Sequence, residues 1–219
     1  MHTEHDTATG FSGSHPRFIV LEGIDGAGTT TQAHLLARAL AQAGEQVYAT
    51  CEPTDGSIGR LIRTLLSGTE QVTPHTMAHL FAADRCEHVY APEHGIVARL
   101  ARGDWVISDR YVFSSLAYQG PDVGFERVRQ LNSGIPLPRW VFHLSLSGKL
   151  AMSRLSGRST LDIYENTAFQ DKVSHAYSTA YQQFPQEDTT WQVLDATDSV
   201  DKIHRSICNS LEIPPINTG

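Results

Sequence analysis

The stretch that most constrains the fold runs from Phe18 to Gln32 and reads FIVLEGIDGAGTTTQ. It begins with a continuous apolar run, which is typical of a strand buried on both faces of a parallel sheet. A glycine-rich turn follows, and residues Thr30 to Ala43 have the spacing of a helix that Gly44 ends. Glycine backbones let several N–H groups converge on one anion, and the helix N-terminus adds partial positive charge. The stretch therefore predicts a phosphate-binding loop.

The loop departs from the motif GxxxxGK[ST] at one position. Gly23, Gly28 and the hydroxyl residue Thr30 match it, but Thr29 stands where the motif has lysine. A lysine ammonium about 4 Å from a phosphate charge contributes on the order of 4 kcal/mol at an effective dielectric constant of about 20. At roughly 1.4 kcal/mol per tenfold, an uncompensated loss costs about three powers of ten in rate. Either turnover is slow or another cation replaces the lysine.

Length and composition favour one globular domain. A chain of 219 residues with 40% hydrophobic content can bury one α/β core. We expect a disordered polar tail over residues 1–16 and a single domain over 17–213. The tail histidines fit a solvated segment better than a metal site, because no further His or Cys completes a ligand set. The net charge of -7 argues against nucleic acid as a partner.

The sequence has neither a membrane span nor the apolar core of a signal peptide. No window of about 18 apolar residues occurs, and the first residues are polar. We therefore expect no membrane partner and a cytoplasmic location.

Strand and helix patterns alternate along the chain. Strands are predicted at residues 18–21, 47–51, 105–108, 141–146 and 191–194, and helices at 30–43, 58–66, 76–102 with a bend near Pro92, 149–155, 165–184 and 199–211. This alternation predicts an α/β fold with a five-stranded parallel sheet and helices on both faces. The polar segment 154–164 interrupts a helical stretch and suggests a mobile, arginine-bearing lid.

The third predicted strand delivers Asp109, Arg110 and Tyr111 at its carboxyl end, where open α/β sheets bind ligands. Thr30 is expected to bring its hydroxyl to a magnesium ion. Asp109 either orients the water shell of that metal or pairs with neighbouring arginines.

Several segments together resemble the thymidylate kinase family. They are the loop GIDGAGTTTQ, the Glu52-Pro53 turn, the helix LFAADRCEHV, the strand end SDRYVFSSLAYQG, the lid and the late LDAT. The resemblance covers most of the chain, and the strand end is far more specific than the loop. It implies a P-loop NTPase three-layer sandwich that binds ATP, Mg²⁺ and dTMP. It further implies transfer of a phosphoryl group from ATP to dTMP, and pairing as a homodimer.

The resemblance also assigns roles to residues. The ATP phosphates would lie on Gly23, Ile24, Asp25, Gly26, Ala27, Gly28, Thr29, Thr30 and Thr31, and the metal near Thr30 and Asp109. Acceptor-binding residues would be Asp25, Glu52, Phe81, Arg85, Arg110, Tyr111, Ser115, Tyr118 and Gln119. Catalytic roles would fall to Asp109, Arg110, Arg154 and Arg158. The segment Asp195 to Thr197 would lie near the adenine.

Two departures from the family pattern leave alternatives open. Cys51 precedes Glu52 where the family usually has arginine, and Arg60 or Arg85 is the expected replacement. For the missing loop lysine, the lid arginines Arg154 and Arg158 are the expected substitutes. The competing functions are a nucleotide-binding protein with impaired catalysis, and a kinase for another nucleoside monophosphate.

Overall fold

The computed structural model describes residues 13–156, 164, 166–183 and 189–218. Within these ranges the strands form a five-stranded parallel sheet with the order β2-β3-β1-β4-β5. The strands are β1 (Ser14–Gly23), β2 (Val47–Cys51), β3 (Trp105–Asp109), β4 (Leu137–Ser145) and β5 (Thr190–Asp195). The fold class predicted from the sequence, a P-loop sandwich with a parallel sheet, is confirmed.

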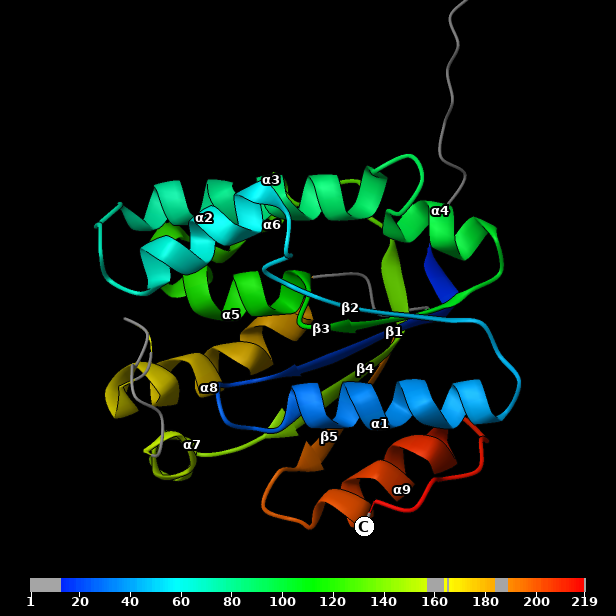
Figure 1. Cartoon of the computed structure of the whole chain (residues 1–219). Helices are drawn as coiled ribbons and strands as arrows, with labels where there is room; N and C mark the ends of the chain where they lie inside the picture. Colours follow the sequence, from blue (N-terminus) through cyan, green and yellow to red (C-terminus); the bar gives the residue numbers. More distant parts are fainter. Residues whose placement is uncertain (1–12, 157–163, 165, 184–188, 219) are drawn as a thin grey trace, which may run out of the picture.

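Helices cover both faces of the sheet (Figure 1). They are α1 (Thr29–Gln42), α2 (Ser57–Leu66), α3 (Pro74–Tyr90), α4 (Ile96–Ala101), α5 (Val112–Val123), α6 (Phe125–Leu131), α7 (Gly148–Leu155), α8 (Thr167–Gln182) and α9 (Val200–Ser210). Helices α1 and α9 pack together on one face, and α3 and α5 lie on the other, where α8 packs against α5 (Figure 1). Residues of the described segments include no helix long and apolar enough to cross a membrane.

Strand β1 is the centre of the core. Its residues Phe18, Ile19, Val20 and Leu21 are completely buried, because helices cover the sheet on both sides. The strand begins at Ser14, so residues 14–16, which the sequence places in the tail, are part of β1. Residues 1–12 lie outside the described ranges.

The pairing of β1 with β3 brings the two predicted functional segments together. In the parallel register Leu21 is the partner of Asp109. The backbone N–H of Arg110 then donates to the carbonyl of Leu21 at 2.9 Å. The phosphate-binding loop and the Asp109–Arg110 segment therefore leave the sheet side by side.

The helix prediction needs correction in two regions of the chain. The long helix predicted over 76–102 is two helices, because Pro92 disfavours helical backbone at Ala91, which is extended (φ -54°, ψ 127°). Gly95 keeps the connection tight, since a Cβ there would lie 2.7 Å from backbone atoms of Ala91. Helices α5 and α6 are absent from the sequence prediction. Gly120 and Pro121, both poor helix formers, fall inside α5 and obscure its pattern.

The predicted lid is described only in part. Arg154 and Leu155 end α7, and Tyr164 precedes α8. Arg158 and the rest of 157–163 lie outside the described residues.

Helix α2 packs through Gly59 against the turn that follows β2. A Cβ at Gly59 would lie 1.9 Å from the carbonyl oxygen of Thr54, which is a backbone atom. Alanine normally stabilises a helix over glycine by about 1 kcal/mol. We expect Gly59→Ala instead to lower the free energy of unfolding by about 2 kcal/mol or more, because α2 must shift off the turn. Urea denaturation measures this, with Thr64→Ala at an exposed position of α2 as the control. A stability equal to or above that of the wild type would contradict the packing.

Candidate functional site

The loop between β1 and α1 has the backbone of an anion cradle. Gly26 and Gly28 adopt left-handed conformations, with φ of 80° and 97°. Gly28 is the capping residue of α1, and because it has no side chain, none of the N–H groups in the first turn donates to a capping side chain. Gly23 has no room for a side chain, because a Cβ would lie 2.9 Å from the carbonyl oxygen of Leu144. The exposed N–H groups and the helix dipole can therefore hold phosphate oxygens.

Thr30 and Asp109 meet beside this loop. The hydroxyl of Thr30 donates to Oδ2 of Asp109. Asp109 is nine-tenths buried, and its other oxygen, Oδ1, has no hydrogen-bond partner among the described residues. A buried carboxylate oxygen beside a hydroxyl fits a hard cation such as Mg²⁺. The described residues contain no cluster of three or more His, Cys, Asp or Glu that could hold a metal. Such an ion would therefore take its remaining ligands from water and phosphate.

Arg110 lies against the same loop, in a left-handed conformation with φ of 71°. Its Nη1 donates to the carbonyl oxygen of Gly23 at 2.5 Å, and its Nη2 to Oδ1 of Asp25 at 2.7 Å. The guanidinium also lies 5.3 Å from the ring centroid of Tyr118. Burial opposes its charge, but Tyr118 and Asp25 keep the pKa of Arg110 above its ordinary value.

Glu22 supports the turn that carries Arg110. It is completely buried, and its Oε1 accepts from the backbone N–H groups of Tyr111 and Ser114 at 3.0 and 3.2 Å. Its Oε2 accepts from the hydroxyls of Ser114 and Tyr177. These bonds satisfy N–H groups at the start of α5, which has no local side-chain cap. Burial raises the pKa of Glu22 to about 7, although these hydrogen bonds and Arg110 oppose the shift.

A pocket of about 210 Å³ opens beside Arg110. The residues predicted to bind the acceptor all line it: Asp25, Glu52, Phe81, Arg85, Arg110, Tyr111, Ser115, Tyr118 and Gln119. The structure adds lining residues that the sequence did not indicate: Pro53, Arg63, Leu66, Ser114 and Tyr164. The loop, the turn after β2, and helices α2, α3 and α5 each contribute, so segments far apart in the sequence converge on one pocket. We call it the acceptor pocket.

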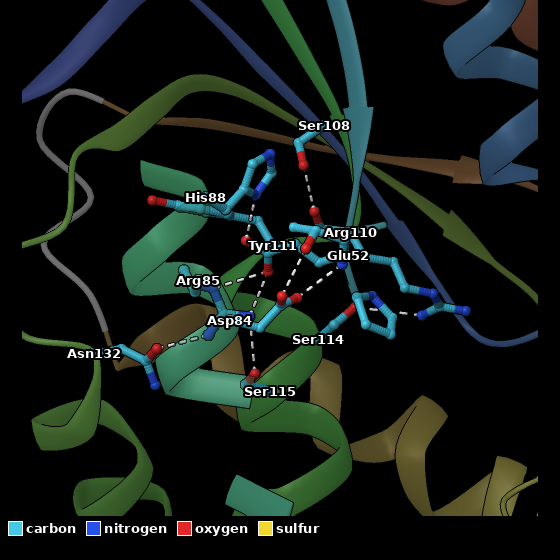
Figure 2. A network of polar contacts seen from close by, with 12 residues as sticks. Glu52, Asp84, Arg85, His88, Ser108, Arg110, Tyr111, Ser114, Ser115 and Asn132 are labelled. Atoms are coloured by element: carbon cyan, nitrogen blue, oxygen red, sulfur yellow. Dashed lines mark hydrogen bonds and ion pairs between the residues drawn. The ribbon is translucent and has the colours of Figure 1, made fainter. Parts of the chain in front are cut away.

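A buried polar network forms one wall of the acceptor pocket (Figure 2). Arg85 donates through Nε and Nη2 to Oε2 of Glu52, at 2.9 and 2.6 Å, and both side chains are at least 97% buried. Further bonds from Arg85 reach Ser115 and Asn132 (Figure 2). His88 binds the other oxygen of Glu52 through Nδ1 at 2.9 Å. Burial opposes the charge of Glu52, but Arg85 and His88 lower its pKa below the ordinary value.

Helix α3, which carries Arg85 and His88, also holds the turn that follows β2. Asp84 accepts from the backbone N–H of Thr54 at 2.7 Å and from its hydroxyl at 2.6 Å. The imidazole Nε2 of His88 lies 2.7 Å from the hydroxyl of Thr50. Helix α3 therefore fixes the turn 52–54 against the acceptor pocket.

Arg60 and Arg85 are the predicted replacements for the arginine that the family usually has at the position of Cys51, and only Arg85 lines the acceptor pocket. Arg60 bonds to the carbonyl of Asp55 and the hydroxyl of Ser57, and it does not line the described acceptor pocket. Arg63, one helical turn further along α2, lines the pocket and donates to the carbonyl of Thr54 at 2.6 Å. Arg63 follows Arg60 by three residues on an amphipathic helix, and this spacing was the sequence signal that could have indicated Arg63 as a pocket residue.

Asp25 is held by two further side chains. Tyr118 donates to its Oδ2 at 3.0 Å, and Gln170 of α8 donates to the same oxygen at 2.8 Å. Gln170 is completely buried. No local pattern signals this role, because Gln170 lies 145 residues from Asp25.

A second, smaller pocket of about 110 Å³ lies beside the loop and the start of α1. Its lining includes Ala27, Gly28, Thr31, Gln32, Arg154 and Ala196. Arg154 donates to the carbonyl of Gly26 at 3.1 Å and to that of Ala196 at 2.7 Å. Asp195 and Thr197 form a closed turn beside it, in which Asp195 accepts from the backbone and hydroxyl of Thr197.

Comparison with known proteins gives a consistent result. The family model described as thymidylate kinase matches residues 21–207. A protein of Treponema pallidum named putative thymidylate kinase is 38% identical over 197 residues, which cover 89% of this chain and 94% of that protein. A probable thymidylate kinase of Pyrococcus horikoshii is 40% identical over 200 residues, covering 87% and 93%. One of Thermococcus onnurineus is 40% identical over 205 residues, covering 89% and 97%.

The raised pKa of Glu22 predicts a pH-dependent stability. The folded state favours the protonated carboxyl, so this contribution is complete below pH 4.5, the unfolded pKa, and is lost as pH rises through about 7. At about 1.4 kcal/mol per pKa unit, the loss is on the order of 3 kcal/mol. Glu22→Gln mimics the protonated form and removes this term. We therefore expect the free energy of unfolding, measured in urea, to fall between pH 5 and pH 8 in the wild type relative to the variant.

The exposed Glu93→Gln variant is the control for this measurement. It should follow the wild-type pH dependence. Parallel curves for the wild type and Glu22→Gln would show that Glu22 titrates normally.

Proposed function

Because the chain belongs to the thymidylate kinase family, we propose that it transfers the terminal phosphoryl group of ATP to dTMP, giving ADP and dTDP with the help of Mg²⁺. The observation that carries this proposal is the position of Arg110. This side chain touches Gly23 and Asp25 of the phosphate-binding loop and also lines the acceptor pocket. Phosphoryl transfer needs donor and acceptor in line with charge stabilisation between them. A cation at this junction meets that need.

The acceptor pocket suits a pyrimidine deoxynucleotide. Phe81 and Arg85 project from one face of α3, so a ring can stack on Phe81 while Arg85 contacts a base oxygen. Tyr111 is completely buried, and its hydroxyl donates to the carbonyl of Pro136 at 3.1 Å. A ring held this firmly leaves little room for a 2′-hydroxyl. As the family resemblance implies, Asp25 would reach the 3′-hydroxyl of the sugar, and Ser115, Tyr118 and Gln119 would line the pocket near the base edge.

The donor side of the proposal uses the loop. Its N–H groups would hold the ATP phosphates, and Thr30 with Asp109 would hold Mg²⁺. When bound, this ion neutralises charge on the phosphate oxygens during transfer. The pocket beside Ala196 would take the adenine, as the family resemblance implies for the segment 195–197.

Two further roles stay proposals. Arg154, which bonds to the loop carbonyl of Gly26, would approach the ATP phosphates from the lid side. Arg158, proposed for the same role, lies outside the described residues. Pairing as a homodimer is also proposed from the family alone.

A coupled assay of ADP release tests the function. With ATP and Mg²⁺, we expect kcat/KM to be about tenfold or more higher for dTMP than for dUMP, because a methyl group in an apolar pocket is worth about 10- to 200-fold. We expect UMP to be worse than dUMP, because Tyr111 crowds the 2′ position. A preference for UMP would overturn the pocket assignment. ADP release at background level with dTMP bound would favour the non-catalytic alternative.

His88→Ala tests the network behind the acceptor pocket. Removing the imidazole leaves Oε1 of the buried Glu52 without that bond, which costs about 1.5–3 kcal/mol for a charged group. We expect Arg85 to lose its fixed position, so that the KM for dTMP rises about tenfold or more while the KM for ATP changes less than threefold. His79→Ala, on the exposed face of the same helix, is the control. Equal effects on both KM values would indicate a general structural role.

A further inference from the structure

Thr29 packs directly against the first glycine of the loop. It is 94% buried and is the first residue of α1. A Cβ built on Gly23 would lie 3.3 Å from Cγ2 of Thr29, so the side chain at position 29 faces Gly23. The lysine of the motif would start from this same place. Thr29 supplies no charge there, so any side-chain cation that stabilises the donor phosphates in place of the lysine comes from another part of the chain.

Arg110 reaches the same glycine from a different strand. Its Nη1 lies 2.5 Å from the carbonyl oxygen of Gly23. The side chain of residue 29 therefore faces the position that a Cβ of Gly23 would take, and the guanidinium of Arg110 binds the carbonyl of the same glycine. The charge of Arg110 and the side chain of residue 29 therefore both adjoin Gly23.

The position of Arg110 is fixed by the surrounding structure. Its side chain is 83% buried, and Asp25 accepts from Nη2 at 2.7 Å. The N–H of Arg110 bonds to Leu21, and Glu22 holds the next residue, Tyr111, through its backbone. A guanidinium held in place loses little entropy when it binds a phosphate, and partial burial strengthens its field.

Arg154, the lid arginine among the described residues, makes different contacts with the loop. Arg154 contacts the loop at Gly26, in its middle, and its other bond goes to Ala196 beside the smaller pocket. Arg154 lines that smaller pocket and is not among the residues that line the acceptor pocket. Its guanidinium is thus tied to the rim of the loop rather than to Gly23.

We propose that Arg110 replaces the missing loop lysine and stabilises the terminal phosphate of the donor as well as the phosphate of the acceptor. This inference rests on the proposed function, because it assumes ATP as the donor. One guanidinium has five N–H donors in a planar fork and can serve two anions at once. Donor binding should then depend on Arg110 even when no acceptor is present.

A double-mutant cycle measures this dependence. The wild type, Thr29→Lys, Arg110→Gln and the double variant are titrated with the Mg²⁺ complex of a non-hydrolysable ATP analogue by calorimetry, without dTMP. Because dTMP is absent, the acceptor role of Arg110 does not enter. We expect Arg110→Gln to weaken analogue binding by about 30-fold or more in the wild-type background, and by less than about threefold in the Thr29→Lys background. Thr29→Lys alone should change affinity by less than about threefold, because the charge is already present.

Three results would overturn the inference. The first is an equal effect of Arg110→Gln in both backgrounds, which would make the two positions independent. The second is a gain of tenfold or more from Thr29→Lys alone. The third is the same non-additivity with Arg154→Gln in place of Arg110→Gln, which would assign the role to the lid. Arg129→Gln, at a surface arginine paired with Glu126, is the matched control and should leave affinity unchanged.

Loss of folding and failure of the proposed function can each be distinguished from failure of this inference. Thermal denaturation monitors each variant, and Arg110→Lys, which keeps the charge, replaces Arg110→Gln if the latter does not fold. Its expected loss of analogue affinity in the wild-type background is less than about tenfold. Absence of dTMP phosphorylation by the wild type would contradict the proposed function, whereas the binding cycle reports on Arg110 without any turnover.

Discussion

The parallel pairing of β1 with β3 is the constraint on which the site depends. It sets Leu21 beside Asp109, so both strands end at the same edge of the sheet. The phosphate-binding loop leaves from one strand and Asp109–Arg110 from the next. Because β1 is completely buried from Phe18 to Leu21 between two helix layers, a slip in this register would turn each side chain toward the opposite layer and disrupt the packing on both faces. The core thus holds the two functional segments in fixed relation.

Two carboxylates near this edge of the sheet form ion pairs. Glu52 is neutralised by Arg85 and bonded by His88, and Asp25 is paired with Arg110. Breaking a buried pair is costly because the remaining charge is uncompensated. Pairing of this kind gives positional precision more than stability. It fixes guanidinium groups at the wall and at the mouth of the acceptor pocket.

Much of the fold was predictable because its signals are local. The apolar run of β1, the glycine turn and the helix periodicity of α1 and α2 can each be seen within a few residues. Helix α5 was missed because Gly120 and Pro121 contradict its type locally, while its packing against α3 and α8 overrides them. The acceptor residues were predicted through family resemblance. Their gathering in one pocket is a property of the fold.

The sequence by itself determined the loop, its flanking strand and helix, and the absence of lysine at position 29. It also led to the expectation that lid arginines replace this lysine, and Arg158 of the lid lies outside the described residues. The tertiary structure placed the guanidinium of Arg110 on the carbonyl of Gly23, 87 residues away along the chain, and Gln170 on Asp25. Periodicity records which face of an element is buried. It does not record which side chains meet when strands far apart in sequence pair at one edge of a sheet.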